Sequence, residues 1–163
     1  NKIENLFIYS KSKNHTDIIQ FQNVYKEYNY IYLCRKWKTI LNLAQITPNI
    51  FIYDYDKKKK YIEKFYDDKY RKQISNINEY YEDDLPQFLL SLSRNEIKNL
   101  LTNIENNLVS ENQAIYKMST IHSFKGLESD YVIVGNDIDK YKEQNLYYVA
   151  LTRGKLLTID LVQ

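Results

Sequence analysis

Apolar positions open the chain as a short run followed by a helical repeat. Residues 5–10 (NLFIYS) are apolar and rich in β-prone side chains, which predicts a strand. Apolar side chains then recur at helical spacing at four positions, Ile18, Phe21, Tyr25 and Tyr28. The opening pattern therefore predicts a strand, a loop and a helix.

The same alternation continues toward the middle of the chain. Residues 30–34 (YIYLC) and 49–55 (NIFIYDY) are predicted strands, and residues 37–45 between them are a predicted short helix. Strands that alternate with helices favour a parallel sheet flanked by helices. We therefore expect an α/β fold with a mostly parallel central sheet.

A charged and aromatic segment, residues 56–84, interrupts this pattern. It includes four consecutive lysines, residues 57–60, and has no clear apolar period. We expect either a solvated helix or an insertion loop here. A lysine run of this kind favours solvated surface over a phosphate-binding patch.

A helix start signal follows the charged segment. Ser93 and Glu96 have the S-x-x-E spacing of a capping box, in which each side chain bonds to the other residue's backbone N–H. Five apolar residues then share one helical face: Ile97, Leu100, Leu101, Ile104 and Leu108. We expect a core-facing helix whose role is packing.

The last third of the chain returns to alternating strands and helices. Its segments are a strand at 115–120, a polar loop at 123–128, a strand at 130–134, a helix at 142–153 and a strand at 156–162. Leu146, Val149 and Ala150 are expected on the inner face of the helix. Parallel sheets place functional residues in loops at the carboxyl ends of strands, so we expect the chemistry of this region there.

Composition narrows the class of protein. The 163 residues suffice for one domain, which we expect to span 1–163, and 44% apolar with 27% charged residues is typical of globular proteins. No apolar run approaches the roughly 18 residues of a membrane span, and no leader precedes a cleavage site. We expect a cytoplasmic or nuclear protein that is not secreted and does not enter a membrane. Because the first residue is Asn1, we expect a piece of a longer protein.

Charge and cysteine content exclude further classes. A net charge of +2 is too small to predict nucleic-acid binding from bulk electrostatics, so any such binding must be local. The single cysteine, Cys34, excludes an internal disulfide framework and a multi-cysteine zinc site. The 17 tyrosines are scattered, as an AT-rich coding sequence would leave them, and predict no stacking surface.

Two long motifs point to a family. Residues 120–134 (TIHSFKGLESDYVIV) resemble motif V of superfamily 1 helicases of the UvrD/Rep type, and residues 143–155 (EQNLYYVALTRGK) resemble motif VI of the same family. Two such motifs in the family's order carry far more weight than a lone K-G-L-E. The resemblance covers about residues 115–162. It implies the second of two RecA-like lobes, with ATP bound in the cleft between them.

The resemblance implies nucleotide-binding roles for three residues. Arg153 corresponds to the arginine finger, a planar and permanently charged group that stabilises the charge developing in phosphoryl transfer. Gly126 and Glu128 correspond to the motif V pair near the nucleotide. A glycine allows close backbone approach to phosphate or ribose, and we expect Glu128 to face the sugar or a water, since a carboxylate repels a triphosphate.

The same resemblance implies contacts to single-stranded DNA. Thr120 and His122 would donate hydrogen bonds to backbone phosphates, and Lys125 could serve either site. The chain departs from the family's pattern at Lys142, where a glutamate is common, and at residues 144–145, where arginine is common. These departures weaken an expected salt-bridge role there. The connection at 136–141 is short for the family.

Arg35 has two interpretations. Residues 33–35, followed by Ile40 and Leu41, faintly resemble motif IV, whose arginine meets the γ-phosphate, although Cys34 replaces the motif's aromatic residue. Arg35 is then a nucleotide ligand. A competing alignment places residues 6–18 on the strand and helix that begin the second half of this lobe, and Arg35 then has no nucleotide role. Both alternatives stay open.

A phosphate-binding loop is absent from the sequence. Its pattern G-x-x-x-x-G-K-[ST] cannot be formed from glycines at 126, 135 and 154 alone. We therefore expect no ATP hydrolysis by this chain by itself and assign no metal ligand in it. ATP with Mg²⁺ would require an upstream RecA-like lobe that carries the P-loop and holds the metal.

The expected function is that of a second motor lobe in an ATP-dependent DNA helicase or translocase. The K-G-L-E form of motif V favours movement in the 3′ to 5′ direction on single-stranded DNA. An alternative is a RecA-like remnant that binds nucleic acid or protein without catalysis, and a third is a helicase lobe fused to a nuclease. A P-loop upstream in the full reading frame distinguishes a motor from a remnant.

Overall fold

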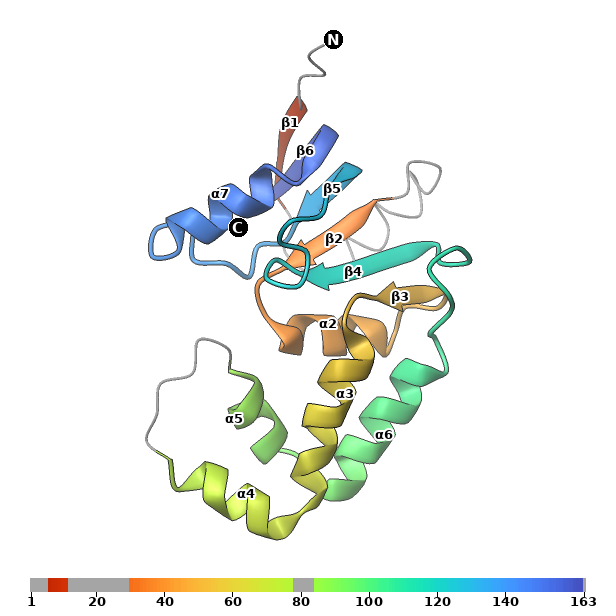
Figure 1. Ribbon diagram of the computed structural model, residues 1–163, viewed down its shortest axis with the longest axis vertical. Coiled ribbons are helices and arrows are strands. Elements are labelled where there is room, and N and C mark those ends of the chain that lie inside the picture. Colours follow the sequence, from red (N-terminus) through yellow and green to blue (C-terminus); the bar gives the residue numbers. More distant parts are fainter. Residues whose placement is uncertain (1–5, 12–29, 78–83, 163) are drawn as a thin grey trace.

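The computed structural model describes residues 6–11, 30–77 and 84–162, which form a parallel sheet with helices around it (Figure 1). The strands are β1 (Leu6–Lys11), β2 (Ile31–Cys34), β3 (Ile50–Ile52), β4 (Tyr116–Thr120), β5 (Ser129–Val134) and β6 (Gly154–Val162). The helices are α2 (Trp37–Ala44), α3 (Tyr55–Glu63), α4 (Asp68–Ser75), α5 (Leu85–Leu90), α6 (Arg94–Glu105) and α7 (Gln144–Leu151), with a 3-10 turn η2 (Lys64–Tyr66).

The six strands described form one sheet in the order β1-β6-β5-β2-β4-β3. Every pair of neighbours is parallel. The predicted α/β class with a parallel central sheet flanked by helices is confirmed, and the arrangement is consistent with a RecA-like fold. Parallel strands end at the same edge of the sheet, so the residues that follow β2, β4 and β5 lie along one edge.

Strand β2 lies inside the sheet and is buried on both faces. Tyr32 and Cys34 pack into the larger hydrophobic core with α2 and α6, whereas Ile31 and Leu33 pack into a second core with Phe124. The second core also holds Ile121, Val132, Val134, Ile138 and Ala150. One face of the sheet is thus covered by helices, and the other by the loop after β4 together with α7.

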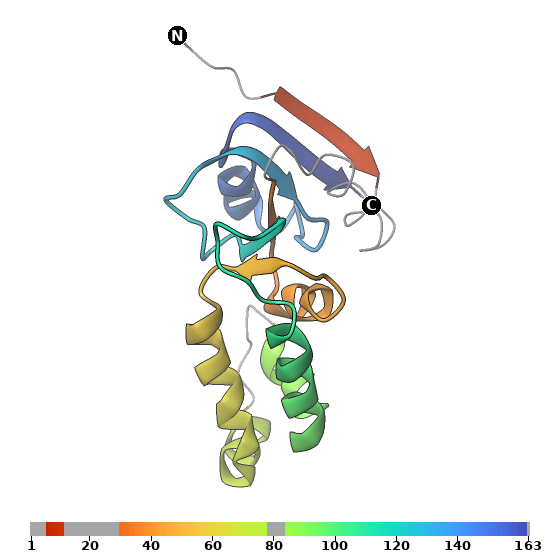
Figure 2. The same cartoon turned by 90° about the vertical axis from the view of Figure 1, so that its right-hand side faces the viewer.

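The helices from α3 to α6 extend away from the sheet beyond β3 (Figure 1). Figure 2 shows α3 and α6 side by side, and Lys59 on α3 pairs with Glu105 on α6. The guanidinium of Arg71 on α4 donates to the carbonyl oxygens of Phe65, Leu90 and Leu92, which closes the far end of this group. The charged segment therefore contains helices, which is the first of the two alternatives expected from the sequence.

Most predicted elements are present, with shorter bounds. The capping box is confirmed, since the Glu96 N–H donates to Ser93 Oγ at 3.1 Å and the Ser93 N–H to Glu96 Oε1 at 3.0 Å. The strand predicted at 49–55 is only Ile50–Ile52, because Asp54 has φ +62° and turns the chain into α3. The helix predicted from the repeat at Ile18 to Tyr28 lies outside the described residues.

Within the described part of the chain, no helix has the length and apolar character needed to cross a bilayer.

Tyr32 offers a test of packing in this sheet. Its ring is fully buried, and among the described residues its hydroxyl has no hydrogen-bond partner. Burial also raises the pKa of this phenol well above its usual value. Because an unsatisfied buried hydroxyl destabilises the folded state, we expect Tyr32→Phe to raise the free energy of unfolding by about 1 kcal/mol in urea denaturation.

The matched control is Tyr53→Phe. Tyr53 donates a 2.9 Å hydrogen bond to Glu111 Oε1, so the same chemical change there removes a bond and should not stabilise the chain. A decrease in stability for Tyr32→Phe would contradict the packing described.

Candidate nucleic-acid interface

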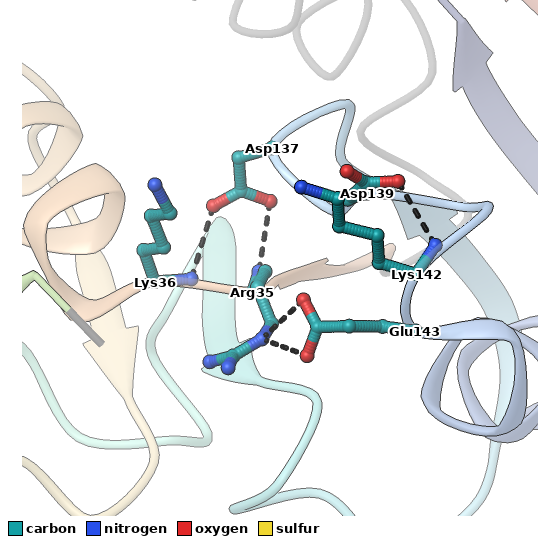
Figure 3. A network of polar contacts seen from close by, with 6 residues as sticks. All are labelled: Arg35, Lys36, Asp137, Asp139, Lys142 and Glu143. Atoms are coloured by element: carbon teal, nitrogen blue, oxygen red, sulfur yellow. Dashed lines mark hydrogen bonds and ion pairs between the residues drawn. The ribbon is translucent and has the colours of Figure 1, made fainter. Parts of the chain in front are cut away.

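The turn between β2 and α2 is held by Asp137, which follows β5 and lies about a hundred positions further along the chain. Asp137 Oδ1 accepts from the Arg35 N–H at 2.8 Å, and Oδ2 accepts from the Lys36 N–H at 3.0 Å (Figure 3). Oδ2 also accepts from Thr39 Oγ1 at 2.8 Å. Both N–H groups precede α2, which begins at Trp37, whereas Thr39 belongs to its first turn. Asp137 therefore fixes the chain at the start of α2, and a carboxylate there suits the positive end of the helix dipole.

Arg35 connects this turn to α7. Its side chain is only 5% exposed, and Nε donates to Glu143 Oε2 at 2.8 Å and Oε1 at 3.0 Å (Figure 3). Glu143 directly precedes α7 and is 31% exposed. Although residues 142 and 144–145 depart from the family's pattern, a salt bridge does exist in this segment, and Glu143 forms it.

Arg35 also lines a pocket of about 430 Å³ together with the predicted DNA-binding residues Thr120 and His122. The remaining lining residues come from three segments: Trp37, Asp54, Lys57, Lys58, Tyr61 and Ser123. The pocket thus lies where α2, α3 and the loop after β4 meet, at the carboxyl ends of β2 and β4. This part of the predicted site is at the expected edge of the sheet.

The loop after β4 is shaped by Thr120. The Thr120 hydroxyl accepts from the Ser123 N–H at 3.1 Å and donates to Ser123 Oγ at 3.0 Å. Thr120 is itself only 3% exposed, so its hydroxyl is used inside the protein, and the exposed polar side chains of the turn are His122 and Lys125. Phe124 then enters the core and fixes the loop against the sheet.

A second group of predicted residues lies at the other end of the strands. The loop that begins at Thr120 crosses one face of the sheet and reaches the start of β5, where Gly126 and Glu128 are exposed. Arg153 ends the α7 region just before β6, and its carbonyl accepts from the Ser129 N–H at 3.0 Å. The expectation that both motifs end at the carboxyl edge is therefore wrong for these three residues, because β5 and β6 begin there.

The Arg153 guanidinium donates hydrogen bonds only to uncharged oxygens among the described residues. Nε donates to the Val149 carbonyl at 3.0 Å, one Nη donates to the Leu127 carbonyl at 3.4 Å, and the other donates to Thr152 Oγ1 at 3.1 Å. Within the described residues no carboxylate pairs with it. Arg153 thus differs from Arg35, whose charge is already matched by a carboxylate.

Gly126 and Glu128 stand in an open environment. Gly126 has φ +87°, and a Cβ at this position would meet nothing within 4 Å. Its backbone conformation alone therefore favours glycine here. Glu128 forms a 3.8 Å ion pair with Lys155, and both side chains are more than half exposed. Lys125 is exposed on the same loop.

The structure therefore divides the predicted nucleotide-binding residues. Gly126, Glu128 and Arg153 lie together, whereas Arg35 lies with Thr120 and His122 at the opposite end of the strands. Sequence reasoning missed Asp137 and Glu143. Glu143 lies inside the segment that resembles motif VI, which was a usable signal, but Asp137 had none because its partners are about a hundred positions away.

The described residues offer little for a metal ion. Among them there is no group of three or more His, Cys, Asp or Glu side chains placed to hold one. We assign none of them to Mg²⁺.

Comparison with known families identifies this region. The model of the UvrD-like helicase C-terminal domain matches residues 117–159, which include both groups of predicted residues except Arg35. No curated protein matches the chain. The match confirms the resemblance to a UvrD/Rep-type C-terminal lobe. It supports a helicase-related role, and with it nucleic-acid binding in general.

The Arg35–Glu143 pair can be tested by stability. Removing the carboxylate takes the Glu143 counter-charge away from a buried guanidinium, so we expect Glu143→Ala to lower the free energy of unfolding by about 2 kcal/mol. Urea denaturation measures this change. Glu128→Ala is the matched control, since it breaks an exposed ion pair whose contribution is about 0.5 kcal/mol or less. Equal effects of the two variants would contradict the burial described for Arg35.

Proposed function

We propose that this chain is the second motor lobe of an ATP-dependent DNA helicase or translocase of the UvrD/Rep type. His122 and Lys125 contact single-stranded DNA, Thr120 holds the turn that presents His122 through its hydrogen bonds to Ser123, and Arg153, Gly126 and Glu128 face a nucleotide. The family match at residues 117–159 supports this assignment. ATP and Mg²⁺ are held chiefly by an upstream RecA-like lobe with the P-loop, and the K-G-L-E motif favours 3′ to 5′ movement.

The observation that carries the proposal is that two segments span from one predicted site to the other. The loop after β4 starts at Thr120 in the pocket and ends beside Arg153, and α7 directly follows Glu143, which pairs with Arg35, and ends at Leu151, two residues before Arg153. A motor lobe needs such a connection, because the state of the DNA must alter the position of a group at the nucleotide. A passive binding module does not need it.

Arg153 fits the role of the finger better than Arg35. Its contacts to carbonyl and hydroxyl oxygens can be exchanged for charge-assisted bonds to phosphate oxygens, which are stronger. Arg35 would have to give up Glu143 first. We therefore place Arg35 on the DNA side of the lobe and assign the γ-phosphate contact to Arg153.

The test uses the full-length protein and its ATPase activity with single-stranded DNA. We expect Arg153→Ala to lower kcat about 10³-fold or more while the affinity for DNA stays within twofold. Arg153→Lys should not restore the rate, because an ammonium cannot form the planar two-pronged contact. Arg94→Ala, at an exposed arginine of α6, is the control.

Two outcomes would remove the assignment. Full turnover by Arg153→Ala excludes the finger role. A full reading frame without a P-loop, together with no ATPase activity, favours the non-catalytic binding module instead.

A further inference from the structure

Helix α3 lies against the turn that carries His122. Lys57 and Lys58, in the first turns of α3, line the same pocket as Thr120 and His122, although more than sixty positions separate them in the chain. The other two lysines of the run point elsewhere: Lys59 pairs with Glu105 on α6, and Lys60 is exposed and does not line the pocket. The helical period thus divides a uniform lysine run into a pocket pair and an outer pair.

Lys58 is held in place by two aromatic rings. Its ammonium lies 5.3 Å from the centre of the Trp37 ring and 5.2 Å from the centre of the Tyr61 ring. Trp37 is 5% exposed and begins α2, so this ring is fixed by the core. Cation–π contacts of this kind orient a long side chain that would otherwise sample many rotamers. The ammonium is therefore positioned at the pocket wall before any ligand binds.

Lys57 supplies charge that is not balanced by a neighbour. It is exposed, and among the described residues no carboxylate forms an ion pair with it. The charge of Arg35 is already matched by Glu143, so the remaining charged lining residues are Lys57, Lys58 and one carboxylate, Asp54. The two lysines outnumber that carboxylate, which suits an anion.

The pocket size and its position narrow the choice of anion. A volume of about 430 Å³ lies within the range of small-ligand pockets, roughly 300–1,000 Å³. The cationic side chains of the lining, such as Lys57 and Lys58, suit a phosphate. They do not form the kind of group that reads base edges in the groove of a duplex. The exposed His122 faces the same space as the two lysines.

We propose that Lys57 and Lys58 bind a backbone phosphate of single-stranded DNA, so that α3 forms the wall of the strand-binding groove opposite His122. This inference rests on the proposed function, in which His122 contacts the strand. It adds a second wall that no motif of the sequence indicates. The lysine run, expected to be solvated surface, thereby has a binding role on one of its faces.

The experiment measures binding of fluorescent single-stranded oligonucleotides to the full-length protein at several salt concentrations. Lys57→Gln removes one phosphate contact, so we expect affinity to fall roughly three- to tenfold at low salt, and the slope of log K against log salt to decrease by about 0.7. The loss should be the same for oligo-dT and mixed sequences, because phosphates carry no sequence information. Lys58→Gln should give a similar decrease.

Lys60→Gln is the matched control, with the same charge change on the same helix outside the pocket. Its affinity should stay within twofold of the parent protein. Equal losses for Lys57→Gln and Lys60→Gln would show bulk charge attraction and overturn the proposal. Lys57 is exposed, so its replacement does not disturb the core, and circular dichroism should show an unchanged fold.

Three further measurements distinguish a failure of this inference from a failure of the proposed function. If His122→Ala weakens DNA binding while Lys57→Gln does not, only the α3 wall is excluded. If the parent protein binds no single strand, both proposals fail. If a non-hydrolysable ATP analogue competes with the oligonucleotide, and Lys57→Gln lowers affinity for the analogue, the pocket binds free nucleotide and the α3 proposal is overturned.

Discussion

A guanidinium at the end of β2 is removed from water, and the arrangement around it follows from that burial. A buried charge needs a counter-charge in good geometry, and Glu143 provides both carboxylate oxygens to Arg35. The backbone next to this guanidinium also needs partners, and Asp137 accepts hydrogen bonds from the N–H groups of residues 35 and 36. Together these contacts fix the loop after β5 and the start of α7 against the β2–α2 turn.

This anchoring also sets the distance between the two groups of candidate site residues. Helix α7 has eight residues, which corresponds to a length of about 12 Å at the usual rise per residue. Glu143, at its start, pairs with Arg35 at the pocket, and Arg153 follows two residues after its end. In the proposed motor lobe, a stiff helix between them would couple the position of the β2–α2 turn to that of the Arg153 guanidinium. The loop from Thr120 to Glu128 provides a parallel connection over the second core.

Local sequence patterns predicted the helices and strands better than they predicted how these elements are arranged relative to one another. The apolar runs at 30–34 and 130–134, and the capping box at Ser93, are local signals that the structure confirms. The positive φ of Asp54 has no such signal, because an aspartate is common in many turns. The hydrogen bonds of Asp137 to the β2–α2 turn and the position of α3 beside His122 are tertiary contacts, which no spacing in the sequence encodes. The family resemblance located Arg153 but not the edge of the sheet on which it lies.

The helical excursion from α3 to α6 leaves and rejoins the sheet at the same place. Tyr53 donates to the Met118 carbonyl at 3.0 Å on its way out, and Val109 donates to the Ile50 carbonyl at 2.9 Å on its return. Because β3 is the outermost strand on this side of the described sheet, nothing beyond it has to be crossed. The excursion is therefore attached to the sheet at its edge strand, while its buried side chains, among them Ile62 and Ile104, form one continuous core with Tyr32 of the central strand.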